Sequence, residues 1–132
     1  MDKINVAIIG VGNCASSLVQ GVHFYRGVDS DSNVPGLMHA NLGGYHISDI
    51  EFVAAIDVDA NKVGKDLSEA VFTPPNNTFK FADVPPLGVK VSRGMTHDSI
   101  GKYLADVVHK APGATSDIVK ILRDSGTHVV VS

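Results

Sequence analysis

Cysteine is almost absent from this chain of 132 residues, and its scarcity limits the setting in which we expect the protein to work. Cys14 is the single cysteine. One cysteine cannot build the intramolecular disulfide framework that supports many small secreted domains. The sequence therefore favours a reducing, cytoplasmic location.

An excess of positive charge is also missing. Fourteen acidic residues outnumber eleven lysines and arginines, which gives a formal net charge of −3. A basic field is the electrostatic footprint of nucleic-acid binding and of attraction to acidic membrane surfaces. No uninterrupted apolar stretch approaches the roughly 20 residues that a membrane-spanning helix requires. We expect neither a nucleic acid nor a membrane as a partner.

Two common catalytic or metal-binding patterns are lacking as well. No serine lies in a G-x-S-x-G elbow, so hydrolase chemistry has no support. The six histidines form no H-x-x-x-H pair and have no cysteine partner at a metal-ligand spacing. The sequence predicts no metal site.

Strand and helix patterns alternate along a composition that is ordinary for one globular domain, with 44% hydrophobic and 19% charged residues. Continuous apolar runs predict buried parallel strands over residues 4–9, 52–56 and 128–131. Residues 89–92 alternate between apolar and polar, as in an edge strand. The chain therefore predicts an α/β fold, a Rossmann-type parallel sheet with flanking helices, in the strand order 3-2-1-4 of its first half.

Apolar residues at helical spacing lie between the predicted strands. The four stripes are Cys14, Leu18, Val22 and Tyr25; Val63, Leu67, Ala70 and Val71; Ile100, Leu104, Val107 and Val108; and Ile118, Ile121 and Leu122. We expect Asp59 to cap the second helix and Pro74-Pro75 to end it. We expect Thr115 or Ser116 to begin the last helix and Gly126 to end it.

Three segments depart from a minimal fold. Residues 26–50 are longer than a simple connection, and loops beyond about 15 residues are usually functional or disordered. Residues 72–87 carry four prolines. The chain stops in an apolar strand, residues 128–131, that belongs inside a sheet. Because proteins cover or charge such edges, we expect further strands of the fold to be missing.

The first predicted strand leads directly into a G-x-G-x-x-A motif, formed by Gly10, Gly12 and Ala15. The first glycine permits a sharp turn, the second permits close approach of a pyrophosphate, and the small third residue permits close packing of helix and strand. A helix that begins near Asn13 would present its free N–H groups and positive dipole end to the phosphates. The motif predicts dinucleotide binding; the alternative is a purely structural turn.

Asp57 ends the second predicted strand, where a carboxylate can accept hydrogen bonds from both ribose hydroxyls of a dinucleotide. The acid usually follows the glycines by about 20 residues, and the 26–50 insertion accounts for the longer spacing. The alternative is that Asp57 or Asp59 only caps the next helix. Since a carboxylate repels the additional phosphate of NADP, we predict NAD, although Lys62 and Lys65 argue in the other direction.

Other residues near these motifs allow two interpretations each. Cys14, in the first turn of the helix, is either reactive or a small apolar spacer whose backbone N–H matters, and we prefer the spacer. Asn13 either reaches the pyrophosphate or caps the helix. Residues 93–94 either approach the adenine end or simply leave the edge strand, and we prefer the second. Residues 96–98, Thr-His-Asp, are interpreted as a capping segment rather than an acid/base pair.

A resemblance to a known family covers essentially the whole chain. The matching segments are Gly10 to Leu18, Val34 to His39, Phe52 to Asp59, Lys62 to Leu67, Asn76 to Thr78, Ala82 to Pro86, Arg93-Gly94 and Ile100 to Tyr103. Together they resemble the bacterial and archaeal branch of inositol-3-phosphate synthase. The insertion at 26–50, which generic dehydrogenases lack, is explained by this resemblance.

The resemblance implies an NAD-dependent isomerase that converts D-glucose 6-phosphate to 1D-myo-inositol 3-phosphate by oxidation, enolisation, aldol cyclisation and reduction. Residues 1–132 would be the N-terminal NAD-binding portion, and the substrate domain with its catalytic residues would be absent, so this segment alone is expected to be inactive. The full protein is expected to be a homo-oligomer, a tetramer. The residues predicted to contact NAD are Gly10, Gly12, Asn13, Cys14, Ala15, Asp57 and, more weakly, Ser132.

Two other functions stay open at this point. One is an NAD-dependent dehydrogenase of the homoserine dehydrogenase or dihydrodipicolinate reductase type. The other is a non-catalytic NAD-binding or assembly module in which the bare strand at residues 128–131 pairs with another polypeptide.

Overall fold

A four-stranded parallel sheet forms the centre of the computed structural model, which describes residues 2–95 and 109–132. Its strands are β1 (Ile4–Ile9), β4 (Ile50–Asp57), β5 (Val91–Arg93) and β6 (Val129–Val131). They lie in the order β5-β4-β1-β6, and each neighbouring pair is parallel. Counted along the chain, this is the order 3-2-1-4, so the predicted first half of a Rossmann-type sheet is confirmed.

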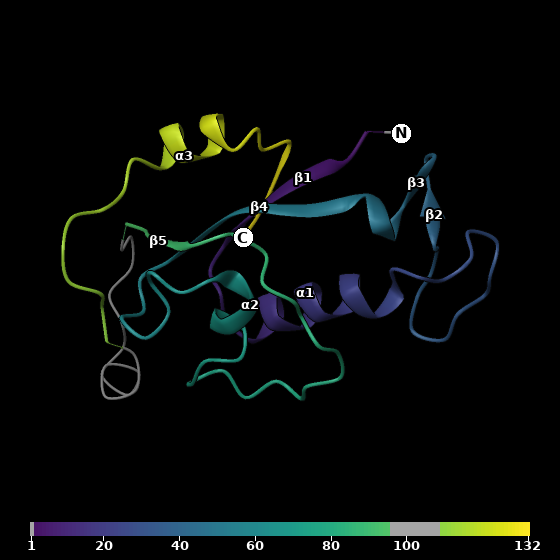
Figure 1. The fold of residues 1–132 in the computed structure, drawn as a ribbon, viewed down its shortest axis with the longest axis horizontal. Coiled ribbons are helices and arrows are strands. Elements are labelled where there is room, and N and C mark those ends of the chain that lie inside the picture. Colours follow the sequence, from purple (N-terminus) through teal and green to yellow (C-terminus); the bar gives the residue numbers. More distant parts are fainter. Residues whose placement is uncertain (1, 96–108) are drawn as a thin grey trace.

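Helices cover both faces of the sheet (Figure 1). The helices α1 (Asn13–Tyr25) and α2 (Leu67–Ala70) lie on one face, and α3 (Ile118–Asp124) lies on the other. In the described part of the chain, no helix is both long enough and apolar enough to cross a membrane.

The hydrophobic core lies between the sheet and the face that carries α1 and α2. Its members include Ile8 of β1, Val19 and Val22 of α1, and Leu67 and Ala70 of α2, all at most 3% exposed. Gly10 then leads the chain out of β1 and into α1 at the carboxyl edge of the sheet.

The buried face of α1 differs from the predicted stripe. Ala15, Val19 and Val22 face the core, whereas Cys14 and Leu18 are exposed. The stripe was misplaced because a polar residue, Gln20, is fully buried on the inner face. Its side chain donates to the carbonyl of Phe79 and accepts from the N–H groups of residues 81 and 82, so it holds the irregular 72–87 segment against α1.

The predicted second helix is mostly a turn. Residues 60–64 form turns, and helix α2 begins only at Leu67, with Asp66 as its N-cap. Before the helix, the chain pairs with the segment that leads into β5: Gly64 N–H donates to the carbonyl of Val91, and Leu67 N–H donates to that of Val89. The prediction that Asp59 caps this helix is therefore wrong, and the helix ends at Ala70, before Pro74-Pro75.

The 26–50 insertion contains structure of its own. Strands β2 (Asn41–Leu42) and β3 (Tyr45–His46) form a small antiparallel hairpin, followed by the 3-10 turn η1 (Ile47–Asp49). The hairpin turn uses two glycines with positive φ, Gly43 and Gly44. Ile50, the last residue of the insertion, begins β4.

Helix α3 begins at Ile118 with Asp117 as its cap, so the prediction of Thr115 or Ser116 is wrong by one or two residues. Asp117 was overlooked because three adjacent residues are all capable N-caps. Gly126, with φ +66°, follows the helix end as expected. The predicted helix over 100–108 and the 96–98 segment lie outside the described residues.

Candidate functional site

Gly10 forms the turn at the carboxyl end of β1. Its φ is +93°, a conformation that L side chains rarely adopt. Its N–H donates to the carbonyl of Ile56 on the neighbouring strand β4, with an N···O distance of 2.8 Å. The turn is thereby fixed to the two central strands, and glycine is required by the backbone itself.

Gly12 is different, because the fold of the described residues does not require a glycine there. Its φ is −95°, which other residues adopt readily, and no described atom lies within 4 Å of the place a Cβ would occupy. Gly12 is the N-cap of α1, and within the described chain no side chain caps this helix end. Open space therefore lies in front of free helix N–H groups, an arrangement that suits an anion such as a pyrophosphate.

Asp57 is held firmly against this turn. Its Oδ2 accepts the N–H of Val11 at 2.6 Å, and its Oδ1 accepts the N–H groups of Val58 at 2.6 Å and of Asp59 at 2.9 Å. The carboxylate therefore caps the turn after β4 rather than a helix. Its position beside the glycine turn is the one in which the sequence expected it.

Two hollows open on either side of Gly10 at the carboxyl edge of the sheet. The larger, of about 200 Å³, is lined by Asp57 and by mostly apolar residues: Ile9, Gly10, Ile56, Val58, Gly94, Met95 and Ile118. The smaller, of about 90 Å³, is lined by Ile8, Ile9, Gly10, Cys14, Ala15, Leu18, Val131 and Ser132. The structure thus brings Cys14, Ala15, Asp57 and Ser132 around Gly10, and the Cys14 side chain is exposed.

Asn13 does not cap α1. Its Oδ1 accepts the N–H of Asn77 at 2.8 Å, the N–H of Thr78 at 3.1 Å and the hydroxyl of Thr78 at 2.7 Å. Its Nδ2 donates to Oδ1 of Asn77 at 3.0 Å. The capping alternative is therefore wrong, and the side chain ties the start of α1 to the 77–78 segment.

A buried ion pair lies beneath the glycine turn, and sequence reasoning missed it. Asp59 is 1% exposed and Lys62 is 4% exposed, with 3.8 Å between Oδ2 and Nζ. Lys62 also donates to Oδ1 of Asn76 at 2.8 Å. The i, i+3 spacing of acid and lysine was the available signal, but it predicts an exposed helical pair more readily than a buried one.

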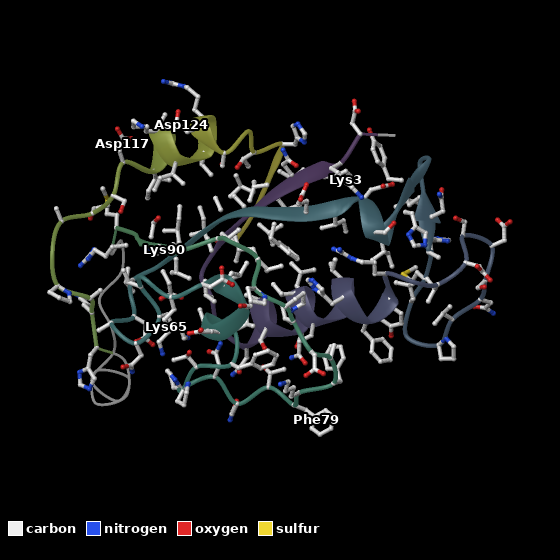
Figure 2. The ribbon with its side chains drawn as sticks, in the orientation of Figure 1. Lys3, Lys65, Phe79, Lys90, Asp117 and Asp124 are labelled. Atoms are coloured by element: carbon white, nitrogen blue, oxygen red, sulfur yellow. The ribbon has the colours of Figure 1, made fainter. Side chains whose placement is uncertain are left out.

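Lys65 is the second lysine whose charge could favour NADP over NAD. It points away from the sheet on the side of α2 (Figure 2). Its Nζ lies 3.4 Å from the Thr73 hydroxyl, to which it donates. Neither Lys62 nor Lys65 lines the hollow beside Asp57.

Arg93 and Gly94, at the end of β5, have different roles. The Arg93 guanidinium donates to the carbonyl of Ala111 at 3.1 Å and to the hydroxyl of Thr115 at 3.4 Å, so it holds the segment before α3. Gly94 lines the larger hollow, and a Cβ there would lie 2.7 Å from Cγ2 of Ile56. A glycine at position 94 therefore allows the chain to pass close to β4.

A parallel sheet in this order, with a glycine turn after its first strand and an acid at the end of its second, defines the Rossmann-type class. No family model matches the chain. Over 130 residues it is 58% identical to an inositol-3-phosphate synthase of Mycolicibacterium smegmatis, and over 129 residues it is 50% identical to one of Corynebacterium glutamicum. Each alignment covers 98% of this chain but 36% of the relative.

Two solved structures share the fold. One, described as the crystal structure of Ari2, is 33% identical with a TM-score of 0.75, over 98% of this chain and 37% of the other. The second, a myo-inositol-1-phosphate synthase-related protein from Thermotoga maritima, is 24% identical with a TM-score of 0.65, over 97% and 33%. The chain is thus similar, over nearly its whole length, to the N-terminal part of inositol-3-phosphate synthases, and the resemblance inferred from its motifs is confirmed.

Proposed function

We propose that residues 1–132 form the NAD-binding portion of an inositol-3-phosphate synthase, which converts D-glucose 6-phosphate to 1D-myo-inositol 3-phosphate. NAD would supply the hydride acceptor for the oxidation and the hydride donor for the final reduction. Because the chain spans 36% of the length of its relatives, the groups for enolisation and cyclisation would lie outside these residues. A homo-oligomeric full-length protein and a cytoplasmic location belong to the same proposal.

The residues at the carboxyl edge fit such a cofactor. Gly12 and the first N–H groups of α1, from Asn13 to Ala15, would hold the pyrophosphate. Asp57 would accept the ribose hydroxyls, and the apolar lining of the larger hollow, with Ile56, Val58 and Met95, suits an adenine ring. Ser132 lines the smaller hollow together with Gly10, which supports a weaker contact of Ser132 with the cofactor.

The preference for NAD over NADP rests on the charges around Asp57. The carboxylate is fixed by three backbone N–H groups and lies on the rim of the larger hollow. A phosphate on the ribose would be repelled there. Of the two nearby lysines, Lys62 is buried and paired with Asp59, and Lys65 is hydrogen-bonded to Thr73, so neither is placed to neutralise that phosphate.

The observation that carries the proposal is the unfilled space at Gly12, next to the fixed carboxylate of Asp57. If the space serves a pyrophosphate, an alanine at position 12 should weaken binding without disturbing the fold. Gly27 provides a matched control, because it too has no positive φ and no described atom within 4 Å of its virtual Cβ, but it lies in the loop after α1.

We would titrate the protein and its variants with NAD+ and NADP+ by calorimetry. Gly12→Ala should weaken NAD+ binding about tenfold or more, because its Cβ would occupy the space proposed for the pyrophosphate, while its unfolding in urea stays like that of wild type and of Gly27→Ala. Asp57→Ala should weaken NAD+ binding by a similar factor and reduce the preference over NADP+. Unchanged NAD+ affinity in Gly12→Ala, or tighter binding of NADP+ by wild type, would contradict the proposal.

Product analysis on the full-length protein separates the proposed isomerase from a dehydrogenase. Inositol phosphate formed from glucose 6-phosphate without net NADH supports the isomerase, because the cofactor is reoxidised within each turnover. Net NADH accumulation would indicate a dehydrogenase, and absence of any turnover with retained NAD+ binding would indicate a binding module.

A further inference from the structure

Asn76 lies in the irregular 72–87 segment, far from the glycine motif in sequence, yet its side chain contacts that motif. Its Nδ2 donates to the carbonyl of Val11 and to that of Val71, each at 3.1 Å. Its Oδ1 accepts from Nζ of Lys62 at 2.8 Å. A lysine amine only donates and a carbonyl only accepts, so these three partners permit one orientation of the amide.

Lys62 is itself held in place. Its side chain is buried, with the Asp59 carboxylate as its ionic partner at 3.8 Å. Asp59 is in turn oriented by the N–H of Asn61, which its Oδ1 accepts at 2.8 Å. A lysine fixed in this way costs little further ordering when it orients Asn76, unlike a lysine on the surface.

The peptide groups of Val11 are held from both sides as a result. The N–H of Val11 donates to Asp57, and its carbonyl accepts from Asn76. The Val11–Gly12 peptide bond is trans, so the Gly12 N–H points opposite to the Val11 carbonyl. Asn76 therefore turns the Gly12 N–H away from the 71–76 segment. At the same residue, no described atom lies within 4 Å of the place that a Cβ would occupy.

We infer that Asn76, oriented by the buried Lys62, is a positioning residue that aims the Gly12 N–H at the pyrophosphate of the cofactor. The inference rests on the proposed function and extends it to a residue outside the glycine motif. If Asn76 positions the Gly12 N–H, ligands with a pyrophosphate should lose affinity when Asn76 is changed, and adenosine should not. If Asn76 has only a structural role, all of these ligands should be affected alike.

Three variants test the inference. Asn76→Asp keeps the size and the acceptor for Lys62, but it replaces the donor that faces the Val11 and Val71 carbonyls with a second oxygen. Asn76→Ala removes the amide altogether. The double variant Asp59→Asn/Lys62→Met removes the orienting amine without leaving a buried charge unpaired. Asn61→Ala is the control, because residue 61 is exposed and serves Asp59 through its backbone N–H.

Affinities for NAD+, ADP and adenosine would be measured by 15N–1H NMR titration, which also follows the Gly12 amide. Both Asn76 variants should weaken NAD+ and ADP about tenfold, and the double variant severalfold, while adenosine stays within about twofold. The shift of the Gly12 amide on addition of ADP should shrink in the same variants. Urea unfolding of each variant shows whether it is folded, and the double variant keeps the test valid if Asn76→Ala is not.

Equal losses for all three ligands, or no loss for NAD+ and ADP in a folded Asn76→Asp protein, would overturn the inference while leaving the proposed function intact. A wild-type protein that binds none of the three ligands would overturn the proposed function, and the inference with it. Asn61→Ala should match wild type throughout.

Discussion

The two faces of the sheet differ in how completely they are packed. On the face of α1 and α2, Val19 and Leu67 are fully buried. On the face of α3, no residue of the helix is buried among those that the structure describes, and Val119 is 65% exposed. The edge strand β6 is also open, with its three valines 39–45% exposed.

The aspartates that cap α2 and α3 differ in the same way, because the cap on the packed face accepts more hydrogen bonds. Asp66, the cap of α2, accepts from the Ser68 N–H and hydroxyl and from the N–H groups of Leu87 and Val89. Asp117, the cap of α3, accepts from the N–H of Lys120 at 3.1 Å. The packed face also carries the Asn76 and Asn13 contacts to the glycine turn, whereas Ile118 of α3 lines the larger hollow. The candidate site therefore draws on both faces of the sheet.

The largest expected effect comes from removing core volume on the packed face. Leu67→Ala should lower the free energy of unfolding by about 2–5 kcal/mol, because Leu67 is fully buried in the core cluster and its truncation leaves a cavity there. Val119→Ala on α3 should change it by less than about 0.5 kcal/mol, since most of that side chain is already in water. Urea denaturation of both variants measures the difference. Similar losses in the two variants would mean that α3 is packed as firmly as α2.

The sequence predicted the strands, α1 and the places of Gly10 and Asp57 from local patterns, whereas the sheet order came from the Rossmann template and the place of Ser132 from the family resemblance. Continuous apolar runs mark buried parallel strands, and a glycine turn between strand and helix has a fixed geometry. Such features need no knowledge of distant segments.

Several of the features that the sequence did not predict depend on contacts across the chain. Helix α2 is short because the backbone of residues 64–67 pairs with residues 89–91 at the start of β5, which the stripe at Val63 cannot reveal. Gln20 is buried and Asn76 is half-buried, and the contacts of both polar side chains make sense only once the 72–87 segment is seen against α1. Polar residues of this kind are usually exposed, so no local pattern marks them.

Removing either aspartate cap should lower the free energy of unfolding by less than Leu67→Ala does, and the two caps should differ from each other. Asp66→Ala should lower the free energy of unfolding by about 1–3 kcal/mol, because it leaves N–H groups of Leu87 and Val89 without their acceptor in a part-buried position. Asp117→Ala should cost about 0.5–1 kcal/mol, in the range of a simple helix cap. The same urea experiment measures both. A cost for Asp117→Ala as large as that for Asp66→Ala would contradict the contrast between the faces.

The smallest expected effect is a dependence of the free energy of unfolding on pH, caused by Asp66 on the packed face. Burial alone would raise the pKa of Asp66, but hydrogen bonds from the Ser68 hydroxyl and from the N–H groups of Leu87, Ser68 and Val89 outweigh it and hold the pKa below its usual value. A lowered pKa in the folded state means that the ionised carboxylate stabilises the fold above the unfolded pKa of about 3.9. This stabilisation is lost as the pH falls through the folded pKa.

Wild type and Asp66→Asn, compared by urea unfolding from about pH 6 down to about pH 3, should therefore differ most at the upper end, and the difference should shrink below about pH 4. Asp49 also has a lowered pKa, caused chiefly by the backbone N–H of His46, but it titrates in both proteins and its contribution cancels. A difference that stays constant over this range would mean that the Asp66 carboxylate acts through its shape and not through its charge.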